Sequence, residues 1–243
     1  MFNFSVSKVV IALIMIVLLF VVVNVIRTRH YINIGKVIAS KARAYEQSPD
    51  NPTATILVMG DSSAVGTGAE DSSKSVAGLL GAEHSRVRII NKAVNGLRTD
   101  ELVAQLPKVE GKVDLIIIHI GGNDIVHFTP LNEVEKNLVS IIETAKTKAD
   151  KVVVLHGGNV GTSKLFPFGS RWIFTMRTKQ VRQIYLKVSA QMDINYVDMF
   201  REVPQDPFYI DPEKYYSNDY FHPSADGYKL WYSQIAPFVS LTK

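Results

Sequence analysis

The sequence predicts an α/β protein in which a five-stranded parallel sheet, with helices on both faces, follows an N-terminal transmembrane helix. From residue 54 onward, short apolar runs of strand length alternate with longer segments that have helical periodicity. Such alternation is typical of parallel sheets, because each crossover between neighbouring parallel strands needs a long connection, usually a helix. Near the N-terminus, residues 9–26 form an apolar run long enough to cross a bilayer.

Each expected strand is a short apolar run bounded by polar or turn-forming residues. The first, ATILVMG, is almost continuously apolar, as a central parallel strand with both faces buried should be. The third, VDLIIIHI, is the most apolar of the set. The five expected strands cover residues 54–60, 87–94, 113–120, 151–157 and 194–199.

The expected helices carry apolar residues at intervals of three or four positions. The clearest stripe runs from Leu131 to Ala145, and Thr129 with Pro130 predicts its cap and first turn. Thr99 is the expected capping residue of an earlier helix. The five expected helices cover residues 75–84, 99–106, 131–145, 171–192 and 225–239.

The N-terminal apolar run, VVIALIMIVLLFVVVNVI, has Asn24 as its one strongly polar residue and is bracketed by Lys8 and Arg27. At 1.5 Å per residue it spans about 27 Å, close to the roughly 30 Å of a bilayer's hydrocarbon core. A signal peptide would need a small-residue cleavage site, and VNVIRTRHYI offers none. We therefore expect an uncleaved, single-pass anchor.

Three parts are expected along the chain. Residues 1–26 form the anchor, residues 27–53 a basic juxtamembrane linker, and residues 54–243 the folded domain. Within the linker, residues 32–44 form either a short amphipathic helix or a solvated tether. Basic residues are more numerous after the helix than before it, which favours the cytoplasmic face. The periplasmic or extracellular face stays open, because long domains are translocated largely regardless of charge.

Composition excludes several kinds of site. The chain has no cysteine, so disulfides, thiolate metal sites and a cysteine nucleophile are excluded. The net charge of +4 is not gathered into a basic block, so nucleic acid is not an expected partner. Neither a short histidine ligand pair nor a complete dinucleotide fingerprint occurs, and we expect no metal and no cofactor.

Glycines and polar residues follow the expected strands where each of them ends. GDSS at residues 60–63 follows the first strand, Gly96 follows the second, and GGND at residues 121–124 follows the third. DYFH at residues 219–222 comes just before the last helix. Ligands of parallel sheets bind outside the carboxyl ends of the strands, so we expect these loops to meet at one edge.

These residue types suit acyl transfer by a serine nucleophile. Ser62 needs a base within hydrogen-bond reach, and His222 can be that base. Asp219 can bind the far imidazole nitrogen of His222 and so select the tautomer. The backbone N–H groups of Ser62 and Gly96 and the side-chain amide of Asn123 are suitable donors for an oxyanion.

Together these motifs resemble the four sequence blocks of the SGNH (GDSL-type) hydrolases, in matching order and spacing over about residues 54–240. The resemblance implies a flavodoxin-like three-layer α/β/α sandwich and an esterase, lipase, thioesterase or carbohydrate deacetylase. It implies that Ser62 is the nucleophile, that Asp219 and His222 complete a triad, and that Gly96 and Asn123 complete the oxyanion hole. One departure is Ser63, where leucine is common, which alters the wall beside the nucleophile.

Other polar residues near the motifs are expected to be structural. Asp61 should hold its own loop through its carboxylate, and Asp124 should bond the loop that carries Asn123. His119 and His156 lie in or at the ends of strands and are expected in the core or at its rim. Two long loops, residues 158–172 and 203–220, either form a lid over an acyl pocket or pack on the domain.

The function expected from these features is that of a membrane-anchored serine esterase acting on lipid-like or medium-chain acyl esters. Its partners would be a small acyl ester, lipid included, and the membrane through the N-terminal helix. Two alternatives remain at this point. One is a carbohydrate O-acetyl esterase, and the other is a catalytically silent, membrane-tethered binding protein.

Overall fold

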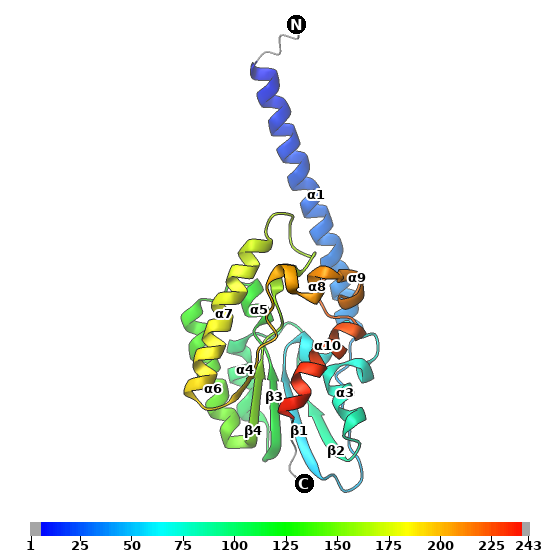
Figure 1. Cartoon of the computed structure of the whole chain (residues 1–243), viewed down its shortest axis with the longest axis vertical. Coiled ribbons are helices and arrows are strands. Elements are labelled where there is room, and N and C mark those ends of the chain that lie inside the picture. Colours follow the sequence, from blue (N-terminus) through cyan, green and yellow to red (C-terminus); the bar gives the residue numbers. More distant parts are fainter. Residues whose placement is uncertain (1–5, 240–243) are drawn as a thin grey trace.

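A five-stranded parallel sheet forms the centre of the molecule, as expected. The computed structural model describes residues 6–239 (Figure 1). The strand order is β2-β1-β3-β4-β5, so the chain reverses direction across the sheet beside β1. The strands are β1 (Ala54–Gly60), β2 (Val87–Asn91), β3 (Val113–His119), β4 (Ala149–Leu155) and β5 (Asn195–Val197), and each pairs in parallel with its neighbours.

Helices cover both faces of the sheet. Successive strand residues point to opposite faces, and because the strands are almost continuously apolar, both faces are apolar and need to be covered. Ile56 and Val58 of β1 lie in one buried cluster with residues of α3 and α10, and Leu57 and Met59 lie in the other with residues of α4, α6 and α7. Figure 1 shows the two groups of helices on either side of the sheet. These helices are α3 (Val76–Glu83), α4 (Thr99–Gln105), α6 (Leu131–Lys148), α7 (Arg171–Gln191) and α10 (Ala225–Ile235).

Several element ends differ from the expected ones for local reasons. The second strand ends at Asn91 rather than at residue 94, because the Asn91 side chain accepts a hydrogen bond from the Ala93 N–H at 3.1 Å. Thr99 is not the cap of α4. The cap position is Arg98, whose N–H donates to the Glu101 carboxylate at 3.0 Å.

The start of α6 also differs, since Pro130 rather than Thr129 occupies its cap position. Short helices that the periodicity does not predict occur in the loops. They are α2 (Ser62–Val65), α5 (Gly122–Val126), α8 (Pro207–Ile210) and α9 (Pro212–Tyr215). Each is four or five residues long, too short to show a helical stripe.

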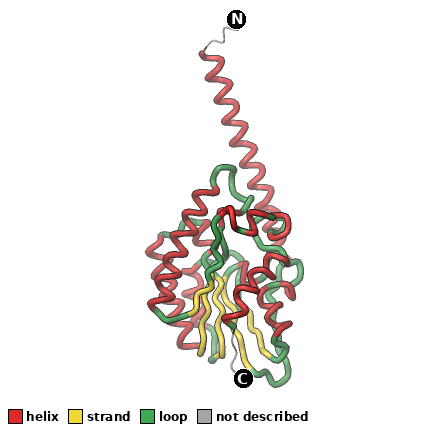
Figure 2. The backbone as a smooth tube through the Cα atoms, viewed as in Figure 1, coloured by secondary structure: helices red, strands yellow, loops and turns green. Residues whose placement is uncertain are grey.

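The N-terminal helix α1 (Val6–Lys41) is one continuous helix of 36 residues. It passes the expected anchor boundary at residue 26 without a break, and its last turns take the place of the separate helix considered over residues 32–44. Its first half projects from the domain and its second half lies along it (Figures 1 and 2). Among the described residues it is the one helix long and apolar enough to cross a membrane.

Candidate active site

Ser62 stands two residues after the end of β1, as the first residue of α2. The turn requires glycine at residue 60, where φ is +141° and an added Cβ would lie 1.8 Å from the His119 carbonyl oxygen. Asp61 then caps α2, since its carboxylate accepts a hydrogen bond from the Ser63 N–H at 2.9 Å. The end of β1 at Gly60 and the start of α2, capped by Asp61, together hold Ser62 at the carboxyl edge of the sheet.

A chain of hydrogen bonds joins Ser62, His222 and Asp219. The Ser62 Oγ lies 3.0 Å from the His222 Nε2, and the His222 Nδ1 lies 2.6 Å from the Asp219 Oδ2. With the Nδ1 proton donated to Asp219, Nε2 is left as an acceptor for the serine hydroxyl proton. The structure thus brings Ser62 together with His222, which follows it by 160 positions in the chain.

The Asp219 carboxylate is held by its own turn. Its Oδ1 accepts hydrogen bonds from the Ser217 Oγ at 2.9 Å and from the N–H groups of Phe221 and His222 at 3.0 Å each. Burial alone would raise the pKa of Asp219, but the bonds and charge of His222 and these backbone donors outweigh it and hold the pKa below its ordinary value. Asp219 is therefore ionised at neutral pH and can stabilise a proton on His222.

Three donors of the kind that an oxyanion needs lie beside Ser62. The Asn123 Nδ2 donates one hydrogen to the Leu97 carbonyl at 3.0 Å, which orients the amide and leaves its second hydrogen for another acceptor. Gly96 has φ +82°, the left-handed region that favours glycine. In the part of the chain that the structure describes, neither the Ser62 N–H nor the Gly96 N–H donates to a protein acceptor.

A family model described as the GDSL-like lipase/acylhydrolase family matches residues 58–230. The chain belongs to this family. It is accordingly an ester-hydrolysing enzyme, and the recognition made on the sequence motifs is confirmed. The match begins within β1, so α1 lies outside the segment that the family model covers.

Named relatives agree with this assignment. The chain is 29% identical over 153 residues to Esterase TesA of Pseudomonas aeruginosa, a match that covers 61% of this chain and 71% of that protein. It is 26% identical over 185 residues to a GDSL-like esterase of Mycobacterium tuberculosis, covering 72% of this chain and 58% of that one.

Solved structures share the fold. The crystal structure of TesA superposes with a TM-score of 0.60 at 23% identity, covering 76% of this chain and 98% of that chain. A lipolytic protein of the G-D-S-L family from Veillonella parvula gives a TM-score of 0.62 at 19% identity, covering 76% and 97%. The predicted three-layer α/β/α fold is thereby confirmed.

Asp124 connects two loops of this GDSL-family site, but not in the expected way. Its carboxylate accepts hydrogen bonds from the Thr99 N–H at 3.1 Å and from the Thr99 Oγ1 at 2.8 Å. Asp124 is fully buried and lies in α5, the short helix that also carries Asn123. Its carboxylate was expected to bond its own loop, but it bonds the first residue of α4, just after the loop of Gly96. Asp124 therefore ties the Asn123 and Gly96 loops to each other, which fixes the distance between two of the donors.

His119 and His156 are buried, as expected for core histidines. The His119 ring lies 5.2 Å from the Trp231 ring, and the His156 ring lies 5.2 Å from the Tyr185 ring. Burial lowers the pKa of His119 to about 3 and that of His156 to about 4, so both are neutral at physiological pH. Neither contributes to the hydrogen-bond chain at Ser62.

One pocket of about 310 Å³ is lined by all five residues predicted for the site: Ser62, Gly96, Asn123, Asp219 and His222. Its apolar walls include Leu165 of the 158–172 loop and Phe221 beside His222. Asn95 also lines the pocket, and α1 forms a further wall through the residues Tyr31, Ile32, Gly35, Lys36 and Ala39.

The α1 wall is the part of the site that sequence reasoning missed. One signal was present. Gly35 is the sole glycine before residue 60, and a lone glycine inside a helix indicates close packing against a neighbour.

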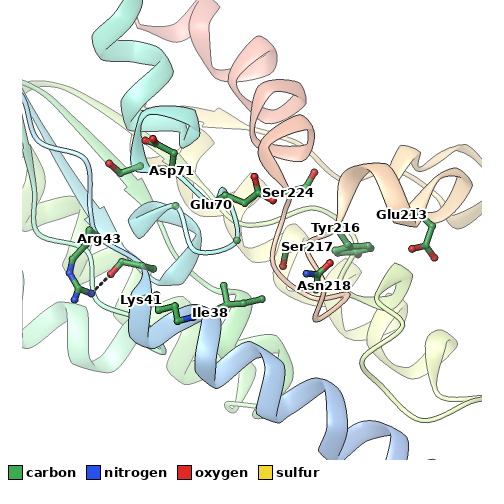
Figure 3. Close-up of a pocket in the computed structure, with 14 residues that line it drawn as sticks. Ile38, Lys41, Arg43, Glu70, Asp71, Glu213, Tyr216, Ser217, Asn218 and Ser224 are labelled. Carbon is green, nitrogen blue, oxygen red and sulfur yellow. Dashed lines mark hydrogen bonds between the residues drawn. The ribbon is translucent and has the colours of Figure 1, made fainter.

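A larger cavity of about 490 Å³ lies at the end of α1, and its lining includes Lys41, Arg43, Glu70 and Asp71 (Figure 3). None of the five predicted site residues lines it. Its size therefore does not make it the candidate active site, which is defined by the motif residues.

The buried Asp61 carboxylate gives the folded state a pH dependence. Burial raises the pKa of Asp61 to about 6, against smaller opposing effects of the Ser63 N–H and His222. This pKa lies above the value of about 3.9 in the unfolded chain. The contribution of protonated Asp61 to the free energy of unfolding is therefore complete below about pH 4 and is lost as the pH rises through about 6.

Replacing Asp61 by asparagine keeps a capping side chain and removes this titration. We expect the free energy of unfolding of Asp61→Asn, relative to wild type, to increase by up to about 3 kcal/mol between pH 4 and pH 8. Denaturant unfolding of the full chain in detergent at the two pH values measures it. A difference between the two proteins that is the same at both pH values would contradict the assignment.

Proposed function

We propose that this protein is a membrane-anchored serine esterase that cleaves acyl esters through an acyl-enzyme on Ser62. The observation that carries the proposal is the hydrogen-bond chain from Asp219 through His222 to Ser62, with its bonds of 2.6 and 3.0 Å. Such a chain allows His222 to take the serine proton while Asp219 holds the required tautomer.

The reaction proceeds in two halves. The Ser62 Oγ attacks the ester carbonyl as His222 Nε2 accepts its proton, and the oxyanion binds the N–H groups of Ser62 and Gly96 and the Asn123 amide. His222 then gives the proton to the leaving alcohol, which leaves an acyl group on Ser62. Water, deprotonated by His222, attacks that acyl group, and Ser62 regains its proton as the acid departs.

Membrane anchoring by α1 is the second element of the proposal. The apolar run over residues 9–26 is exposed around the helix apart from Asn24, as a helix surrounded by lipid would be. Its flanking charges favour the cytoplasmic face, which stays a prediction. Reagent labelling of single cysteines introduced after residue 41, in intact cells and in lysed ones, tests the side.

The pocket favours lipid-like or medium-chain acyl groups over acetyl. A volume of about 310 Å³ with apolar walls from Ile32, Leu165 and Phe221 is of the size that holds a drug-sized ligand, many times larger than an acetyl group. The O-acetyl esterase alternative has no comparable support from the pocket. The silent binding protein is disfavoured because the hydrogen-bond chain at Ser62 is complete.

Hydrolysis of p-nitrophenyl esters from acetate to palmitate, by the full chain in detergent micelles, tests this function. We expect a maximum at hexanoate or a longer chain, because the apolar walls gain free energy with each methylene buried. A maximum at acetate would indicate the O-acetyl esterase. Absence of turnover at every length in the folded protein would instead support the binding protein.

Removing the Asn123 amide should weaken oxyanion binding. For Asn123→Ala we expect kcat to fall by about 10²–10³ with little change in KM, as for the loss of one oxyanion donor. Asn137→Ala is the matched control, because the Asn137 amide donates to the Thr99 Oγ1 at 3.2 Å and does not line the pocket. Equal losses in the two variants would show that Asn123 acts through structure alone.

A further inference from the structure

The second half of α1 is seated directly on the site. A Cβ added at Gly35 would lie 2.9 Å from the Asp219 Oδ2, the same oxygen that bonds His222. One turn further along the helix, the Ala39 carbonyl accepts a hydrogen bond from the Asn95 Nδ2 at 3.1 Å, next to Gly96. The helix therefore touches both the acid and the oxyanion side of the site.

The tip of the 158–172 loop is fastened to the same helix nearer the membrane. The Arg27 guanidinium donates to the carbonyl groups of Lys164 and Phe166. The Phe168 N–H donates at 2.7 Å to the side chain of Asn24, which also donates to a carbonyl of its own helix and is buried. Asn24 is two residues inside the end of the apolar run, or about 3 Å along the axis, so the loop tip reaches the edge of the hydrocarbon.

Two openings follow one another along one face of α1. A groove of about 340 Å³ between α1 and Pro167 lies nearer the membrane, and the site pocket lies further along the helix. At 100° per residue, both sets of helix residues centre on the same side of the helix. We call this face the acyl-chain track, which runs from Phe20, Val21 and Val25 at its membrane end to Ile32, Gly35 and Ala39 beside the site.

Exposed apolar side chains continue this lipid-facing surface onto the domain. Phe168, Trp172, Ile173 and Met176 lie at the loop tip and on the first turns of α7, and Trp172 is 67% exposed. Tryptophan is enriched where proteins meet the membrane interface. The top of the domain, where α7 and the loop approach α1 in Figure 1, is thus suited to rest on the bilayer.

We propose that the acyl-chain track guides the chain of a membrane lipid ester from the bilayer to Ser62. The inference rests on the proposed esterase function and adds to it the substrate class and its route. From Ile26 to Gly35 the helix rises about 14 Å, so the ester leaves the hydrocarbon while its chain remains on the track. The groove residues Phe20, Val21 and Val25 belong to the apolar run, so this end of the groove opens to the hydrocarbon, where an acyl chain is the natural occupant because water is absent.

Blocking the track at the level of the bilayer tests the route. Val25 lines the groove nearer the membrane, whereas Val23 is rotated 200° from it around the same helix and is about equally exposed. In vesicles that contain the full chain, Val25→Trp should lower the ratio of long-chain lipid ester turnover to soluble butyrate ester turnover by about tenfold, an ordinary cost of overpacking. Val23→Trp should keep the wild-type ratio. Equal ratios in the two variants would overturn the proposal.

A second measurement does not depend on turnover. A phospholipid with a photoreactive acyl chain, added to the same vesicles, should crosslink to Leu165 and Pro167 in wild type and in Val23→Trp, and much less in Val25→Trp. Crosslinks that are the same in all three proteins would overturn the track. If the wild-type protein is not labelled by a fluorophosphonate and cleaves no ester, the proposed esterase function is wrong. The crosslinks then still show whether a lipid acyl chain binds along the acyl-chain track.

Discussion

Ser62→Ala is expected to abolish ester hydrolysis, with kcat reduced by about 10⁴–10⁶. The reason is that no hydroxyl of the described residues other than that of Ser62 hydrogen-bonds to the His222 ring. The Ser62 Oγ alone lies 3.0 Å from the Nε2 of that histidine among the described side chains. Turnover of the full chain on butyrate and decanoate esters, with labelling by a fluorophosphonate, measures the loss.

The neighbouring serine provides a matched control for Ser62→Ala. Ser63 contributes to the turn through its backbone N–H, which bonds Asp61, so Ser63→Ala removes a hydroxyl and keeps that bond. We expect Ser63→Ala to remain active and both variants to unfold at the wild-type temperature. Turnover of Ser62→Ala within tenfold of wild type would refute the nucleophile assignment.

Asp219→Asn is expected to lower kcat by about 10⁴ while the protein stays folded. The Asp219 Oδ2 accepts the Nδ1 proton of His222 at 2.6 Å, and an amide at that place would favour the opposite tautomer, whose Nε2 cannot accept the serine proton. The Oδ1 can still accept its three hydrogen bonds as an amide oxygen, so the turn that holds it should survive.

Asp226→Asn is the control for the charge change, because Asp226 is an exposed carboxylate in the first turn of α10. Steady-state kinetics of both variants should show a loss confined to kcat of Asp219→Asn. A loss of less than tenfold in kcat of Asp219→Asn would mean that Asp219 holds the turn and does not orient His222.

The contact between α1 and Asp219 has a consequence for experiments on the isolated domain. Asp219 is 1% exposed in the full chain, and part of its cover is the helix at Gly35. A fragment that begins after residue 45 would lose that cover and a wall of the pocket. Its ester preference would accordingly describe a more open site than that of the whole protein.

The alternation of elements and the motif residues could be predicted from sequence, because both depend on near neighbours. Strand β1 and helix α6 follow from apolar spacing, and Gly60 through Ser63 follow from the chemistry of a turn. The five site residues could be named because parallel strands bring their carboxyl ends to one edge. The cap positions were predicted less well: the Thr99 hydroxyl donates to the buried Asp124 carboxylate, and Arg98 occupies the cap position of α4.

The sequence by itself thus determined the fold class, the family, the apolar helix and the residues around Ser62. Only the tertiary structure decided that α1 continues past residue 26 and closes the pocket with Gly35 against Asp219. It also decided that Asp124 joins the loops that carry Asn123 and Gly96. The physical reason is that these contacts link residues far apart in the chain, and their surfaces meet only when the sheet is assembled. Local periodicity carries no information about which loop a helix face will touch.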